Sequence, residues 1–157
     1  RGRVVDAFTE AVDLYPTLLE AVGAEPAHIG DGSSLAPWLA GELPARWRES
    51  VHWEFDFREV ATQAAERALG LSSTELNMAA IRTQKFKYVH FAALPPLLFD
   101  LERDPDNLRN IADDPAYAGA RIEMAEKLLS WRARHLDQTL ALKELTPAGV
   151  VSVPVVR

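Results

Sequence analysis

The chain has 157 residues, of which 48% are hydrophobic and 25% charged, with a formal net charge of −6 and no cysteine. These values fit one globular domain. The acidic balance argues against a nucleic-acid partner, the lack of cysteine excludes disulfides and thiolate metal sites, and no apolar run approaches the ~20 residues that span a bilayer. We therefore expect no nucleic acid and no membrane as partners, while the compartment stays open.

The N-terminal part predicts one amphipathic helix followed by a loop. Thr9 can cap the first turn, Pro16 is a kink or the first position of a restarted helix, and Gly23 stands where a helix C-terminus favours glycine. One apolar face combines four side chains: Leu14, Leu18, Leu19 and Val22. Residues 24–43 are rich in Pro and Gly and read as a loop with a short helix over 35–40.

The middle of the chain predicts strands. Residues 51–58 alternate strictly between apolar and polar side chains, which is typical of a strand. An Ala-rich helix over 59–69, stopped by Gly70, should follow. Three further strands are expected over 79–83, 86–91 and 97–101. With the first strand, over 51–57, they suggest a small four-stranded antiparallel sheet.

The longest helical stretch spans 115–140. Its expected core stripe consists of Ile122, Ala125, Leu129, Leu136 and Leu140. Glu123 and Lys127 form a supporting pair one helical turn apart. This helix should cover one face of the sheet, so the fold class is α+β. The tail over 146–157 is rich in valine and prone to form strands.

Four segments together resemble a known family. They are Val12-Asp13-Leu14-Tyr15-Pro16-Thr17-Leu18-Leu19, Asp31-Gly32-Ser33-Ser34-Leu35, Ile81-Arg82-Thr83-Gln84-Lys85-Phe86-Lys87-Tyr88, and the stretch from Leu97 to Ala112 with Asp104-Pro105 and Asn110-Ile111-Ala112. In this order they resemble the C-terminal part of the sulfatase branch of the alkaline phosphatase superfamily. The family usually has Glu where Asn107 stands, but Asn can still cap the turn. Residues 88–98 and 131–136 look most like the phosphonate monoester hydrolase or arylsulfatase subgroup.

The resemblance implies catalytic groups that this chain lacks. The family's nucleophile is a formylglycine made from Cys or Ser in a Cys-x-Pro-Ser-Arg type of motif, and its metal ligands include an Asp-His or Asp-Asn pair followed by Gly. Neither motif occurs here. In the family both lie upstream of the helix that contains Pro16. We therefore expect a C-terminal piece of a larger hydrolase, with no catalytic or metal-binding residue of its own, whose missing N-terminal part carries formylglycine and a divalent metal (Ca, Mn or Mg).

The best candidates for chemistry are four polar residues of the first strand: His52, Glu54, Asp56 and Arg58. Alternation places them on one face, about 7 Å from one to the next. They could line a substrate pocket or an anion site, with Arg58 contacting an oxyanion. The alternative is a solvated or interdomain face whose charges pair with Lys85 or Lys87. The chain's four histidines show no ligand spacing.

Two functions remain open from the sequence. In the first, residues 1–45 end the large catalytic domain, residues 46–145 form a C-terminal subdomain that completes the fold and the pocket, and residues 146–157 are an oligomer contact. The partners would then be the chain's own missing catalytic domain and a second copy. In the second, the chain is a stand-alone, non-catalytic module for binding or oligomerisation.

Overall fold

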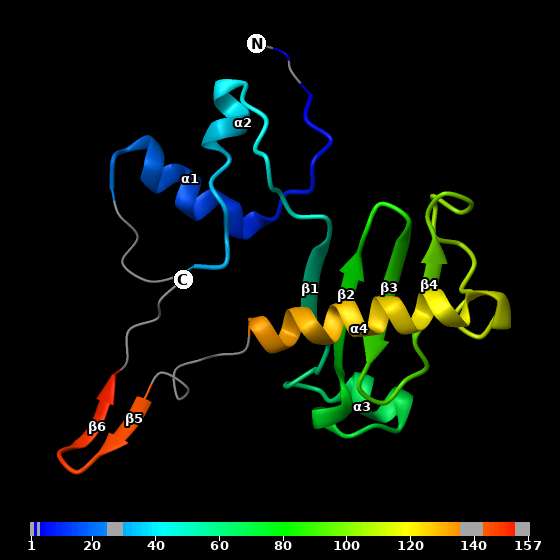
Figure 1. The fold of residues 1–157 in the computed structure, drawn as a ribbon. Helices are drawn as coiled ribbons and strands as arrows, with labels where there is room; N and C mark the ends of the chain where they lie inside the picture. Colours follow the sequence, from blue (N-terminus) through cyan, green and yellow to red (C-terminus); the bar gives the residue numbers. More distant parts are fainter. Residues whose placement is uncertain (1, 3, 25–29, 136–142, 153–157) are drawn as a thin grey trace.

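The computed structural model describes residues 2, 4–24, 30–135 and 143–152. The fold is α+β, as expected: a four-stranded sheet is crossed by one long helix, and a smaller helical part lies beside the sheet's first strand (Figure 1). The elements in chain order are η1 (Ala11–Asp13), α1 (Leu14–Ala21), α2 (Ala36–Ala40), β1 (Val51–Asp56), α3 (Ala64–Leu69), η2 (Ser73–Glu75), β2 (Asn77–Arg82), β3 (Phe86–Phe91), β4 (Leu97–Asp100), η3 (Pro115–Tyr117), α4 (Ala118–Arg134), β5 (Lys143–Thr146) and β6 (Gly149–Ser152).

The main sheet is an antiparallel meander in the order β1-β2-β3-β4. Its strands are those expected from the sequence, with bounds that differ by no more than two residues. Ile81 of β2 lies opposite both His52 of β1 and Tyr88 of β3, and Tyr88 lies opposite Leu98 of β4. Opposite residues point to the same side of a sheet. These four side chains therefore share one face.

Helix α4 covers that face and closes the core (Figure 1). The buried cluster consists of Ala79, Ile81, Tyr88, Leu98, Ile111, Ala112, Met124 and Leu128. The expected core stripe of α4 is wrong in two places, because Ile122 and Leu129 are 57% and 68% exposed while Met124 and Leu128 are buried. Ala125 does pack against the core. Leu136 and Leu140 lie outside the described residues. The Glu123–Lys127 pair is confirmed, with 2.7 Å between Oε1 and Nζ.

The turn after β4 is built by side-chain acceptors. The two carboxylate oxygens of Asp104 accept the N–H groups of Leu108 and Arg109 at 3.0 and 2.8 Å. Asn107 has a φ of +58°, a conformation that asparagine tolerates better than most residues. The side-chain oxygen of Asn110 accepts the N–H of Leu98 at 2.9 Å, so the loop closes over the edge of β4.

The N-terminal helix begins later than expected. Glu10, not Thr9, is the N-cap of η1. The Glu10 side chain accepts the backbone N–H of Asp13, and the Asp13 side chain accepts the backbone N–H of Glu10, which together form a capping box. Pro16 is the third residue of α1, within the first turn, where a missing N–H costs little. Gly23 follows the C-cap with a φ of +69°, as expected for a helix end.

Helix α3 is shorter than predicted. Helix α3 covers only Ala64–Leu69, because the left-handed Gln63 (φ +50°) stands before it; Gly70 ends it as expected. The expected short helix over 35–40 is present as α2. Residues 143–152 form a hairpin, β5–β6, that pairs with itself. Within the described residues no helix is long and apolar enough to cross a membrane.

Candidate functional site

The polar side of β1 faces helix α4. His52 lies opposite Ile81 and Glu54 opposite Ala79, and both partners belong to the core face. The aromatic side of β1 points the other way, where Phe55 is 58% exposed. Helix α4 therefore packs near at least two of the four candidate residues, His52 and Glu54, so the four do not form a fully solvated surface.

His52 is held in a stack of three rings. Its imidazole lies on the indole of Trp131 with 4.4 Å between ring centroids and 5° between planes. His135 stacks on Trp131 at 5.1 Å and 27°. Burial, followed by the nearby charges of His135, Arg134 and Arg48, lowers the pKa of His52 to about 4. The His52 side chain is therefore neutral at pH 7.

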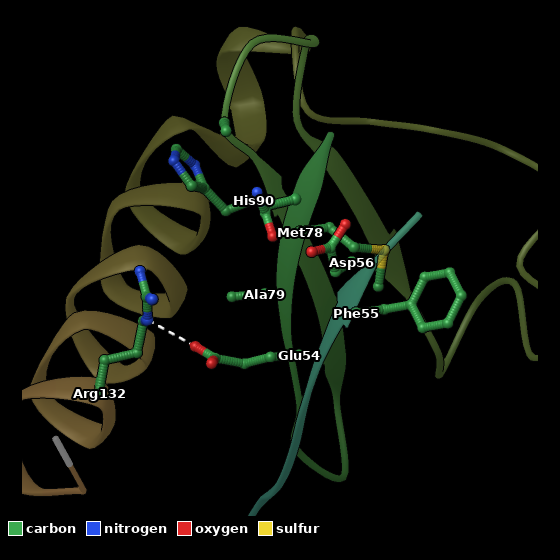
Figure 2. Close-up of a pocket in the computed structure, with 9 residues that line it drawn as sticks. Glu54, Phe55, Asp56, Met78, Ala79, His90 and Arg132 are labelled. Carbon is green, nitrogen blue, oxygen red and sulfur yellow. Dashed lines mark ion pairs between the residues drawn. The ribbon is translucent and has the colours of Figure 1, made fainter. Parts of the chain in front are cut away.

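Glu54 and Asp56 line an open cavity of about 410 Å³ beside α4, together with apolar residues such as Met78 (Figure 2). Glu54 points toward Arg132 of α4 and forms an ion pair with it, at 2.5 Å. Asp56 forms an ion pair with Arg58, also at 2.5 Å, although Arg58 lies beyond the end of β1. The expected pairing with Lys85 or Lys87 is therefore wrong: Lys85 pairs with Glu102 instead.

Two residues of this cavity were not expected from the sequence. Arg132 comes from the last turns of α4, and His90 comes from β3 (Figure 2). Arg132 reaches the cavity through the crossing of α4 over the sheet, and His90 through the pairing of β3 with β2, where it lies opposite Ala79. The available signal was that both residues lie in segments that resemble the phosphonate monoester hydrolase subgroup.

The charges of this cavity are paired within the chain. The carboxylate of Asp56 pairs with Arg58 and that of Glu54 pairs with Arg132, so each negative charge is balanced by a positive one. Across the described part of the chain, no three His, Asp or Glu side chains gather in a way that could hold a metal ion. A role of His52, Glu54, Asp56 and Arg58 in a substrate pocket stays a prediction.

A second polar cluster joins the first two family-like segments. The fully buried carboxylate of Asp13 accepts the N–H of Ser33 at 2.8 Å and forms an ion pair with Arg48. Arg48 also pairs with Glu10 at 2.5 Å, and Glu10 accepts the N–H of His52 at 2.8 Å. This cluster of Glu10, Asp13 and Arg48 connects η1, the loop at Ser33 and β1.

The same contacts explain other residues of these segments. The Thr17 hydroxyl donates to the Asp13 carbonyl oxygen and accepts the N–H of Leu35. The Ser34 hydroxyl accepts the N–H of Ala36 at 3.1 Å, at the start of α2. The polar residues of these two segments therefore have structural partners.

Comparison with known proteins places the chain in a family. Residues 1–134 match the family described as N-sulphoglucosamine sulphohydrolase, C-terminal. The chain is 43% identical over 151 residues to the multifunctional alkaline phosphatase superfamily protein PehA of Trinickia caryophylli, covering 96% of this chain and 29% of that protein. It is also 29% identical over 147 residues to an N-acetylglucosamine-6-O-sulfatase of Bacteroides thetaiotaomicron, covering 91% of this chain and 24% of that protein.

The fold agrees with solved structures of similar proteins. A phosphonate monoester hydrolase of Agrobacterium radiobacter superposes with a TM-score of 0.84 at 53% identity, over 98% of this chain and 31% of that one. The enzyme SpPMH of Silicibacter pomeroyi superposes with a TM-score of 0.83 at 37% identity, over 96% and 30%. The chain thus spans less than a third of the length of these relatives. It belongs to the N-sulphoglucosamine sulphohydrolase C-terminal family and corresponds to the C-terminal portion of sulfatases and phosphonate monoester hydrolases of the alkaline phosphatase superfamily.

Proposed function

We propose that this chain is the non-catalytic C-terminal part of a metal-dependent hydrolase of sulfate, phosphate or phosphonate esters. The observation that carries the proposal is the match of nearly the whole chain to less than a third of a phosphonate monoester hydrolase, with a TM-score of 0.84. The role of the chain is to complete the fold and to shape the pocket of the longer protein.

The chemistry would then come from the part that this chain does not include. Formylglycine requires a Cys or Ser in its motif, and this chain has no Cys and no Ser-x-Pro-Ser-Arg. The described residues also do not fit a metal. The nucleophile and the divalent cation, Ca²⁺, Mn²⁺ or Mg²⁺, would both belong to the catalytic part of the longer protein.

The partner that this proposal requires is that catalytic part. The apolar face of α1 supports it, because Leu14, Leu18 and Val22 are 55%, 65% and 76% exposed. An amphipathic helix with an open apolar face usually packs against another element. The cavity at Glu54 and Arg132 would lie near the pocket of the longer protein, where Arg58 could contact a substrate oxyanion.

The test begins with the reading frame that precedes Arg1. A Cys-x-Pro-Ser-Arg or Ser-x-Pro-Ser-Arg motif is expected there, and the longer protein should hydrolyse p-nitrophenyl sulfate or p-nitrophenyl phenylphosphonate in a way that a chelator abolishes. The isolated chain should show only the buffer rate. Hydrolysis by the isolated chain that is lost on chelation would reveal an overlooked site and contradict the proposal.

The pocket role is tested separately in the longer protein. Arg58→Met should raise KM for the ester, since it removes a cation from the pocket. Lys127→Met, which breaks an exposed ion pair elsewhere on the chain, is the matched control and should leave KM unchanged. Equal kinetics of both variants and the parent would remove Arg58 from the pocket.

The second candidate is a stand-alone module for binding or oligomerisation. The self-paired β5–β6 hairpin, with Val150 62% exposed, is the observation that favours it. A reading frame that starts near Arg1, without either motif upstream, would support this candidate instead.

A further inference from the structure

We propose that the three stacked rings of His52, Trp131 and His135 form an acid-sensitive clasp. At neutral pH the clasp holds the C-terminal end of α4 against β1, and protonation of His52 releases it. This device is independent of the hydrolase activity proposed above, because it concerns contacts within this chain.

The clasp joins two elements that are far apart in the sequence. Trp131 and His135 are four residues apart and so lie on one side of α4. Their rings continue the stack that begins with His52 on β1. The His52 end is fixed, since its backbone N–H donates to Glu10 at 2.8 Å and Glu10 pairs with the partly buried Arg48. Moving the His52 ring therefore changes the contact of β1 with α4 while the backbone of β1 stays anchored.

The charges around His52 come from every element packed against it. Helix α4 presents Arg134 and His135, together with Glu126 and the Glu123–Lys127 pair. The segment before β1 presents Arg48 and Glu49; η1 presents Glu10 at its N-cap; the loop before α2 presents Asp31; and β1 itself presents Glu54.

The carboxylates of this group are largely engaged with other cations. Glu10 pairs with Arg48, Glu54 with Arg132, and Glu123 with Lys127. Asp31 lies 4.0 Å from His135 rather than against His52. The charges that act most on His52 are accordingly the positive ones of His135, Arg134 and Arg48, and together with burial they hold its pKa near 4.

One effect works in the opposite direction. A protonated imidazole on the face of an indole gains a cation–π attraction of about 1 kcal/mol. Burial of the ring and the positive charges beside it, such as those of Arg134 and Arg48, act against protonation in the stack. On this proposal they exceed the cation–π attraction, so that the protonated ring is more stable in water than in the stack.

Space for that movement lies on both sides of the ring. His52 lines a cleft of about 940 Å³ toward η1 and another of about 500 Å³ toward the middle of α4. Neither cleft is lined by the core residues Met124 and Leu128.

The sign of the pH effect follows from linkage. Because the pKa of His52 is lower in the folded chain than its usual value of 6.5, the unfolded or opened form binds more protons between pH 6.5 and 4. The contribution of His52 to stability is thus complete above pH 6.5 and is lost as the pH falls toward 4.

Hydrogen exchange of single backbone amides tests the clasp directly. The His135 N–H, which donates to the Trp131 carbonyl at 3.1 Å, reports the last turn of α4. After correction for the intrinsic exchange rate, its protection should fall by more than about tenfold between pH 7 and pH 4.5, while amides of β3 change little. His52→Phe keeps a flat ring that cannot be protonated, and it should remove most of this fall.

Two controls make the result decisive. His90→Phe removes a histidine of similar chemistry outside the stack, and it should leave the fall in protection unchanged. The His52 ring resonances should titrate near pH 4 in the parent chain. A fall in His52→Phe as large as in the parent, or a His52 midpoint near 6.5, would overturn the proposal.

Discussion

Gly32 lies against the backbone of η1, so that a Cβ at this position would overlap the carbonyl group of Val12. The contact joins the Asp31-Gly32-Ser33 segment to the helix that contains Asp13. Gly32→Ala should therefore destabilise the chain by about 1–3 kcal/mol, since backbone atoms on both sides must shift. Urea unfolding followed by circular dichroism measures the change.

The matched control for this substitution is Gly119→Ala in α4. A Cβ at Gly119 meets nothing within 4 Å, and alanine is the better helix former by about 1 kcal/mol. Gly119→Ala should therefore be neutral or stabilising. If the two alanine variants unfold at the same urea concentration, the close approach of Gly32 does not matter for stability.

Arg48→Met should be among the most destabilising single substitutions in the chain. It leaves the fully buried carboxylate of Asp13 without its cation, and removing one partner of a buried ion pair costs about 3–5 kcal/mol. Arg58→Met removes an arginine from the exposed pair with Asp56 and serves as the control. Its midpoint in urea should stay close to that of the parent. Similar losses in both variants would mean that burial of Asp13 adds nothing.

The comparison of α4 with its prediction shows what periodicity can and cannot decide. The sequence predicts the helix, its supporting Glu123–Lys127 pair and its place over the sheet, and all three are present. It assigns the wrong stripe, because Leu128 and Leu129 are adjacent leucines that belong to different faces, and only the sheet decides which one is buried. Helical spacing alone contains no information on that choice.

The candidate site shows the same limit more strongly. The alternation of β1 correctly groups His52 with Glu54 on one side. The alternation does not say whether that side faces solvent or another part of the protein, and a polar strand face usually faces solvent. In this fold it turns to α4, since Trp131 and Arg132 provide a ring and a cation for it. Likewise, nothing near Asp13 in the sequence indicates its partner Arg48, which lies 35 positions away and is brought to it by the fold.

The turn at Asp104 should depend on pH at the acid end. The N–H groups of Arg109 and Leu108 lower the pKa of Asp104 below its usual value of 3.8. Its carboxylate therefore stabilises the folded chain above that value, and the contribution is lost as the pH falls through the lower folded pKa. Asp104→Asn keeps only one good acceptor and should be less stable than the parent at pH 6.

Unfolding in urea over a range of pH checks this expectation. The difference between Asp104→Asn and the parent should shrink at the lowest pH at which both chains still fold. Two-dimensional NMR of the carboxyl group should place the Asp104 midpoint below 3.8. A difference that stays constant down to acid pH would show that the charge of Asp104 does not act on the turn.

The remaining prediction concerns association of the chain with itself. Two apolar surfaces are open to a partner: the outer face of α1, with Leu18 65% exposed, and the β6 strand, with Val150 62% and Val151 40% exposed. The further tail valines, Val153, Val155 and Val156, lie outside the described residues. Short apolar strands add readily to sheet edges, and the commonest arrangement of two copies is a two-fold dimer.

We therefore expect the isolated chain to be a dimer at micromolar concentration, with the tail or α1 in the contact. Sedimentation velocity would compare the parent with a chain that ends at Leu145 and with Leu18→Glu. If the tail forms the contact, the shortened chain is a monomer and Leu18→Glu remains a dimer; if α1 forms it, the result is reversed. Leu108→Glu, at a side chain that is 84% exposed in the Asp104 turn, controls for the added charge and should remain a dimer. A parent chain that sediments as a monomer, like all three variants, would contradict self-association. These surfaces would then be left to bind the catalytic part of the longer protein.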